Sequence, residues 1–261
     1  MFDSHCHLDF PELDDGRDVQ IAQGLSCGIE QWFVPGCTPS QWPRVRQLRA
    51  HAEVLVGYGI HPWWACDAHR SDTRTLDQTM SALRQALLHD GAVALGECGL
   101  DRVREAEVPL AVQVPVFEAQ LALARELSLP LVLHEVRARE PFLRCLDRVG
   151  LSPAGGVIHG FSGDSVWAQT LLHRGLLLGI GPALLRRGRE KLRFAAASAD
   201  LSRLLVETDA PDQGIDGQRG RLIDLVAVVA ELARLRQTEA TPIARQTAFN
   251  ARLLFGQRAP R

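Results

Sequence analysis

Eight short apolar segments recur along this chain, and each is followed by a stretch with the residue spacing or end signals of a helix. The segments are mostly continuous apolar runs, such as residues 131–133 and 204–206, and not alternations of apolar and polar residues. Continuous apolar strands indicate a parallel sheet that is covered on both faces. Eight strand–helix units therefore predict an α/β fold, a closed (β/α)8 barrel of the TIM type.

We expect strands at residues 1–8, 31–36, 53–60, 92–97, 131–134, 156–159, 176–181 and 204–209. We expect helices at residues 14–28, 38–50, 71–90, 110–127, 140–149, 165–174, 188–197, 221–237 and 242–255. Asp14 and Asp15 are candidate caps of the first helix, and Gly28 ends it. No linker interrupts the pattern, so we expect one domain over residues 1–261. An open doubly wound sheet is the alternative, but no glycine-rich dinucleotide-binding loop follows the first strand.

Composition places the chain among soluble globular proteins, with 46% hydrophobic and 23% charged residues. The net charge of −2 argues against a broad basic face for duplex DNA, although a locally positive pocket is compatible with it. We interpret the charged run 186–193 as a solvated helix start, with contact to an anionic ligand as the alternative. No apolar run is long enough to span a membrane, and no signal peptide is evident. Six scattered cysteines without a CxxC motif indicate reduced thiols in the cytoplasm.

Imidazoles and carboxylates recur where the predicted strands end, which is where barrels of this type carry their chemistry. The candidate metal ligands are His5, His7, Glu97, His134, His159 and Asp209. Taken singly, each could be a satisfied core histidine or a helix cap. Six such residues at the same rim are not expected by chance. Nitrogen and carboxylate donors suit Zn²⁺, Mn²⁺ or Fe²⁺ and disfavour Ca²⁺. Six ligands exceed the needs of one catalytic ion, so we expect two ions about 3.5–4 Å apart.

Charge determines the substrate class that such a pocket favours. Two divalent ions bring four positive charges, and Glu97 and Asp209 cancel two of them. The remaining positive charge would polarise a phosphoryl or carbonyl oxygen and lower the pKa of a bound water. Asp209 is our candidate to orient that water and accept its proton. Glu207, two residues earlier on the same strand face, supports a ligand or is a structural acid held by an arginine.

Five sequence blocks together resemble the signature of the TatD family of metal-dependent deoxyribonucleases, which belongs to the amidohydrolase-type barrels. The blocks are His5-Cys6-His7, Gly59-Ile60-His61-Pro62, residues 96–101, residues 159–163 and residues 207–211. The resemblance implies a metal-dependent phosphodiesterase that acts on DNA or another phosphodiester, as a 3′-to-5′ exonuclease on single strands. It also implies two divalent ions (Zn, Mg or Mn). The sequence itself gives no sign of membrane association or of an obligate protein partner.

The resemblance further implies how the ligands divide between the ions. His5, His7, Glu97 and Asp209 would bind one ion. Glu97 would be shared, and with His134 and His159 it would bind the other. Glu97 and Asp209 are therefore the expected catalytic residues.

Four residues near the expected rim are candidate substrate contacts: His61, Trp63, Arg102 and Arg137. His61 could contact a phosphate, and Trp63 could stack on a base or simply pack in the core. The two arginines could bind phosphate or pair with nearby acids. Arg102 stands where the family usually has an aromatic residue. Arg137 is one place later than the family's arginine.

Two other functions are alternatives to DNA hydrolysis. A related barrel could hydrolyse a non-nucleic-acid ester, lactone or amide, but many such enzymes bridge their ions with a carboxylated lysine. Lys191 is the only lysine of this chain and lies beyond the seventh predicted strand. A non-enzymatic metal-binding protein is the third possibility, and the complete ligand set argues against it.

Overall fold

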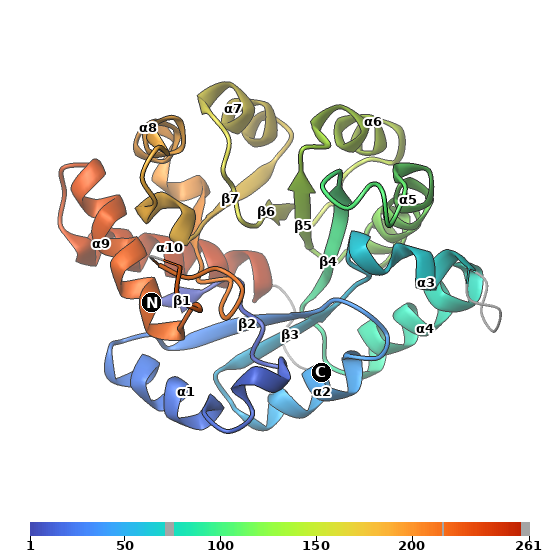
Figure 1. Ribbon diagram of the computed structural model, residues 1–261, viewed down its shortest axis with the longest axis horizontal. Helices are drawn as coiled ribbons and strands as arrows, with labels where there is room; N and C mark the ends of the chain where they lie inside the picture. The colour runs from blue at the N-terminus through green and yellow to red at the C-terminus, as the bar shows by residue number, and fades with distance from the viewer. Residues whose placement is uncertain (71–75, 216, 257–261) are drawn as a thin grey trace. The chain divides into compact units, whose positions relative to one another are not determined.

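The computed structural model describes residues 1–70, 76–215 and 217–256. Its strands are β1 (Phe2–Asp3), β2 (Gln31–Gly36), β3 (Val54–Tyr58), β4 (Ala94–Asp101), β5 (Leu131–Val136), β6 (Gly156–Ile158), β7 (Leu176–Ile180) and β8 (Leu204–Val206). They form one sheet in chain order, and the pairs β1–β2, β3–β4, β4–β5 and β7–β8 are parallel. Helices alternate with these strands along the chain (Figure 1). The predicted (β/α)8 fold is confirmed.

The helices follow the predicted order, and several match the expected bounds closely. The α-helices are α1 (Arg17–Ser26), α2 (Trp42–Gln47), α3 (Ala65–Arg70), α4 (Leu76–His89), α5 (Leu110–Leu127), α6 (Arg139–Val149), α7 (Ser165–His173), α8 (Glu190–Ser198), α9 (Leu225–Leu235) and α10 (Ala240–Phe255). In the described part of the chain, six short 3-10 helices accompany them: η1 (Pro11–Leu13), η2 (Leu48–Ala50), η3 (Pro62–Trp64), η4 (Pro182–Leu185), η5 (Leu201–Arg203) and η6 (Leu222–Asp224). No helix among the described residues is long and apolar enough to cross a membrane.

Two compact units make up the chain. The first comprises Met1–Val34, Leu48–Leu55 and the described part of Ile158–Gln257. The second comprises Pro35–Gln47 and Val56–Val157. The single domain over residues 1–261 stays a prediction.

In the first unit, the segment after β1 runs alongside the end of β8. Ser4 N donates to Val206 O at 3.0 Å, and Asp209 N donates to His5 O at 2.8 Å. Hydrogen bonds between the first and last strands are what closes a barrel-type sheet. They also place the backbone of residue 5 beside that of residue 209. Beneath this end, Phe255 of α10 stacks on Phe33 with ring centroids 4.4 Å apart, so α10 is anchored in the core of the unit.

In the second unit, glycines allow β4 to lie very close to its neighbours. A Cβ atom at Gly99 would stand 1.9 Å from His134 O, and one at Gly59 would stand 2.5 Å from Glu97 O. Side chains other than hydrogen cannot be accommodated at such approaches. The pairing of β4 with β5 also shifts register between Leu95 and Cys98. This irregularity lies at Glu97, so the strand is locally shaped around that residue.

Several element boundaries differ from the predicted ones. The first strand is only Phe2–Asp3, because the backbone of residues 4–7 bonds partly to the β8 segment and partly to β2. β4 continues to Asp101, four residues beyond its predicted end. The N-cap of α1 is Gly16 and not an aspartate, since Asp14 pairs with Arg17 at 2.6 Å. Residues 62–70 form η3 and α3, which were not predicted, and residues 71–75 of the helix predicted at 71–90 lie outside the described part.

Candidate metal centre

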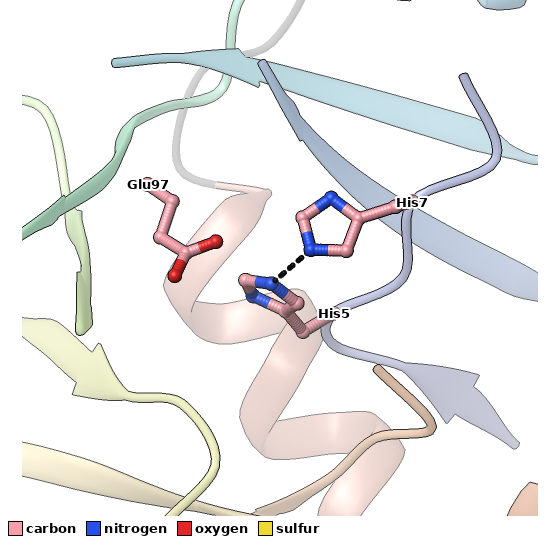
Figure 2. A group of neighbouring side chains, drawn as sticks. All are labelled: His5, His7 and Glu97. Atoms are coloured by element: carbon pink, nitrogen blue, oxygen red, sulfur yellow. Dashed lines mark hydrogen bonds between the residues drawn. The ribbon is translucent and has the colours of Figure 1, made fainter. Parts of the chain in front are cut away.

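Two imidazoles and a carboxylate converge in the first unit. His5 and His7 are on the segment that follows β1, and Asp209 is on the segment that follows β8. The Nε2 atoms of the two histidines lie 3.3 Å apart, and Figure 2 shows their rings pointing toward one another. Asp209 Oδ1 lies 3.7 Å from His5 Nε2 and 3.4 Å from His7 Nε2. All three side chains are buried, so their polar atoms face one another and not bulk water.

These three atoms have the mutual spacing of ligands around one metal ion. With separations of 3.3, 3.4 and 3.7 Å, the point equidistant from all three lies about 2 Å from each, which matches Zn–N and Zn–O bond lengths. The donor set of two imidazoles and a carboxylate suits the same class of ion. The residues present therefore fit a divalent metal.

His159 extends this group within the first unit. Its ring stacks on that of His5, with centroids 3.9 Å apart and planes 11° apart. Ligand atoms of His5, His159 and Asp209 all lie within 4.8 Å of one another, as a metal site requires. Behind His159, the Glu207 carboxylate accepts a hydrogen bond from Gly160 N and lies 3.9 Å from His159 Nδ1. Glu207 thus contacts the segment that carries a candidate ligand, and no arginine among the described residues pairs with it.

Burial and neighbouring charges act in opposite directions on the acids of this unit. Burial alone would raise the pKa of Asp209, but the hydrogen bond with His7 and the nearby imidazoles outweigh it and lower the pKa to about 2. For Glu207, burial outweighs the charge of His159 and the hydrogen bond from Gly160 N, and it raises the pKa of Glu207 to about 8. Asp209 is therefore the ionised acid that faces the imidazoles. Its backbone is left-handed, with φ of 51°, a strained conformation of the kind found at functional sites.

A second group of candidate ligands lies in the second unit around Glu97. Glu97 Oε1 lies 2.9 Å from His134 Nδ1 and 3.3 Å from His61 Nε2. Glu97 Oε2 accepts a weak hydrogen bond from the Cys37 thiol at 3.7 Å. The ligand atoms of His61, Glu97 and His134 are close enough to hold an ion together. Figure 2 also labels Glu97.

His61 has a defined tautomer. Its Nδ1 accepts a hydrogen bond from Trp63 N at 3.2 Å, so the proton of the neutral ring is on Nε2. Nε2 then donates toward Glu97. In this state His61 presents an N–H and not a lone pair, which is the form that contacts an anion.

Asp101 connects His134 to Trp63. Its Oδ2 lies 3.3 Å from His134 Nε2 and accepts a hydrogen bond from Trp63 Nε1 at 2.7 Å. Burial opposes the charge on His134, but hydrogen bonds with Asp101 and Glu97 outweigh it and raise the pKa of His134 to about 9. The Arg104 guanidinium lies 4.6 Å above the Trp63 ring. One face of this indole is therefore covered by a cation.

The TatD related DNase family model matches residues 2–256 of the chain. The chain belongs to this family. It is therefore a hydrolytic enzyme of a metal-dependent family, and the resemblance inferred from the sequence blocks is confirmed.

Similar proteins extend over essentially the whole chain. The uncharacterized metal-dependent hydrolase YjjV of Escherichia coli K12 is 32% identical, with 98% of this chain and 97% of that protein covered. The 3′-5′ ssDNA/RNA exonuclease TatD of Erwinia amylovora is 34% identical, with 98% of this chain and 100% of that protein covered. The crystal structure of the E. coli YjjV, a TatD homologue, matches with a TM-score of 0.87 and 30% identity over 100% of this chain and 98% of that one.

The predicted substrate contacts of this TatD-family chain have different surroundings. His61 is buried against Glu97, whereas Trp63 is 39% exposed. Arg102 is exposed and lies 3.7 Å from Glu105, so it has an acidic partner. Arg137 is exposed directly after β5, with φ of 54°, so the strand ends before it. Their roles toward substrate stay predictions, as do the roles of the six metal-ligand candidates.

Three residues of the second unit were missed by sequence reasoning: Cys37, Asp101 and Arg104. Asp101 had a signal, because it is four residues after Glu97 in the same apolar run, and an even spacing keeps side chains on one face of a strand. Cys37 and Arg104 are in loops after strands, and no spacing in the sequence links them to Glu97 or Trp63. Cys6 and Cys98, expected to pack and not to bind metal, are buried with their sulfur atoms near backbone carbonyls.

Proposed function

We propose that this protein is a phosphodiesterase that removes nucleotides from the 3′ end of single-stranded DNA with the help of divalent metal ions. The observation that carries the proposal is the group His5, His7 and Asp209, whose ligand atoms are 3.3–3.7 Å apart. Family membership and the relatives named as 3′-5′ ssDNA/RNA exonucleases support the substrate class. Zn, Mg and Mn are the candidate ions, two per chain.

In this proposal each unit contributes its own ligands. His5, His7, His159 and Asp209 would hold an ion in the first unit, and Glu97 and His134 would be ligands in the second. The assignment of Glu97 to both ions stays part of the proposal. When bound, such ions polarise a phosphoryl oxygen and make water a better nucleophile. Asp209 is ionised at neutral pH, so it orients the attacking water and accepts its proton.

Other side chains of the second unit would act on the substrate. His61 carries its proton on Nε2, which faces Glu97 at 3.3 Å; with Glu97 engaged by an ion, this N–H would be available to donate to a phosphate oxygen. Trp63 is 39% exposed and is held through its indole N–H by Asp101, with Arg104 over the ring, so its exposed part would stack on a base. Arg102 and Arg137 are exposed and would contact phosphates further along the strand.

A substrate panel tests the proposal. Purified protein is incubated with Mg²⁺, Mn²⁺ or Zn²⁺ and a 5′-labelled single-stranded 20-mer, the same DNA as a duplex, bis(p-nitrophenyl) phosphate and p-nitrophenyl acetate. We expect a ladder of products shortened from the 3′ end of the single strand, and no cleavage with excess EDTA. Hydrolysis of the acetate ester with no cleavage of either phosphodiester would contradict the proposal and favour an ester, lactone or amide hydrolase.

We also propose that the protein acts in the cytoplasm. Its six cysteines are all free thiols, and Cys6, Cys37, Cys98 and Cys145 are buried. This is the state expected in a reducing compartment. Detection of the protein by fractionation outside the cytoplasm would contradict this assignment.

A further inference from the structure

A run of basic residues follows β7 in the first unit. Residues 186–193 contain five basic side chains and one acidic side chain, Glu190. Four of the basic ones are exposed, and we call them the β7 basic run: Arg186, Arg187, Arg189 and Lys191. None of the four forms an ion pair with a residue that the structure describes. Many other arginines of the chain are paired with acids, so this concentration of uncompensated charge is a distinct feature of the surface.

The fifth basic residue, Arg193, fixes the backbone of the run. Its guanidinium donates to Leu184 O and Arg186 O, both at 3.1 Å, and lies 3.6 Å from Glu231. These bonds tie the start of α8 to the end of η4. The four side chains of the β7 basic run are therefore carried by a backbone that is held at both ends.

The strand that precedes the β7 basic run ends beside the segments that carry the metal ligands of the first unit. Gly179 O at the end of β7 accepts a hydrogen bond from Phe161 N, two residues after His159, at 2.9 Å. Ile180 O accepts one from Glu207 N, two residues before Asp209, at 3.1 Å. β7 thus lies between the two ligand-bearing segments, and the run follows it in the chain after η4.

An exposed aromatic ring accompanies these charges. Phe194 on α8 is 67% exposed. It lies three residues after Lys191, and residues three apart are neighbours on the surface of a helix. A cation beside an exposed aromatic ring is the combination that proteins use to hold the backbone and bases of a single strand.

We propose that the β7 basic run and Phe194 form a binding surface for single-stranded nucleic acid, along which the strand extends away from its 3′ end at the metal centre. This inference rests on the proposed function and specifies how a long substrate is held. The protein as a whole carries a net charge of −2, so a strand is attracted locally and not by the whole surface. Regularly spaced phosphates match four adjacent cations that lack acidic partners, and Phe194 stacks on a base.

Binding to a labelled oligonucleotide tests the inference without catalysis. Fluorescein-labelled dT20 is titrated with metal-free protein in EDTA at several NaCl concentrations, and anisotropy gives the Kd. The variant changes all four residues of the β7 basic run to Gln. The matched control changes four exposed arginines elsewhere to Gln: Arg49, Arg144, Arg148 and Arg245. Both variants remove the same charge, and circular dichroism verifies that both are folded.

We expect the β7 variant to raise the Kd for dT20 at least about tenfold at 100 mM NaCl. Each phosphate contact on a single strand contributes about 0.7 to the magnitude of the slope of log K against log salt. Removing the four basic side chains should therefore reduce that magnitude by about 3. The control stays within about twofold of the wild type. Phe194→Ala raises the Kd about fivefold or more with the slope unchanged. Equal effects of both charge variants, or salt-independent binding of the wild type, would overturn the inference.

Hydrolysis of bis(p-nitrophenyl) phosphate separates this inference from the proposed function. This diester is too small to extend along the β7 basic run, so the β7 variant should hydrolyse it at the wild-type rate. If the metal-loaded wild type hydrolyses neither this diester nor DNA, the proposed function fails. If the variant binds dT20 like the wild type while both hydrolyse the diester, only the inference fails.

Discussion

Asp101 Oδ2 lies 3.3 Å from His134 Nε2, on the side of the ring opposite the nitrogen that faces Glu97. Each nitrogen of His134 thus faces a carboxylate, and hydrogen bonds with both outweigh burial and raise the pKa of this imidazole to about 9. A metal-free imidazole in this position carries a proton at neutral pH. An ion bound through one nitrogen would replace that proton.

The stability of the metal-free protein should therefore depend on the charge of His134. A folded-state pKa raised from 6.5 to about 9 gives a contribution that is complete below pH 6.5 and is lost as pH rises through 9. Between pH 6.5 and 9.5, we expect the free energy of unfolding of the wild type in EDTA to fall by roughly 2 kcal/mol more than that of His134→Gln. Urea unfolding at pH 6.5, 8 and 9.5 measures this. Parallel losses in the two proteins would contradict the assigned protonation.

Asp209→Asn should nearly abolish hydrolysis while the fold persists. The change removes a charged ligand and the proposed proton acceptor. Asn tolerates the left-handed backbone at this position, where φ is 51°, so the segment can keep its shape. Activity on single-stranded DNA and on bis(p-nitrophenyl) phosphate is measured next to thermal unfolding. Retention of more than about a tenth of wild-type activity, a loss under roughly 1.4 kcal/mol, would contradict the role of Asp209.

Much of this arrangement could be predicted from the sequence, because strand ends in a (β/α)8 fold lie at one rim. That rule placed His5, His7 and Asp209 as candidates, and the structure brings these three together in the first unit. The backbone bonds from the β1 segment to the β8 segment are the physical reason. The helix predicted over residues 110–127 also matches α5, which is flanked by Pro109 and Ser128.

The surroundings of Glu97 could not be predicted in the same way. Strand alternation gives the face of a side chain only while the strand is regular, and β4 shifts register between Leu95 and Cys98. The contacts of Glu97 with His61 and Cys37 come from loops whose paths depend on tertiary packing. The sequence therefore made His61 a candidate substrate contact but did not indicate that it faces Glu97.

Gly99→Ala should destabilise the protein strongly. A Cβ atom there would stand 1.9 Å from His134 O, and the φ of Gly99 is 149°. The steric clash and the backbone conformation therefore both oppose a side chain at this position. We expect a loss of roughly 3 kcal/mol or more in the free energy of unfolding. Gly16→Ala is the control, because nothing lies within 4 Å of its Cβ position and the cost at a helix N-cap is about 1 kcal/mol or less. Similar stability of the two variants would show that β4 and β5 are less closely packed than described.

The metal content of the protein tests the central claim, that His5, His7 and Asp209 hold a divalent ion. Metal-free protein is loaded with Zn²⁺ and passed through a desalting column, and the bound zinc per chain is measured by mass spectrometry. The control is His173→Ala, which changes an exposed histidine of α7. We predict two ions per chain for the wild type and the control, and the loss of at least one ion in the folded double variant His5→Ala, His7→Ala. An unchanged ion count in the double variant, or no ion in the wild type, would contradict the account.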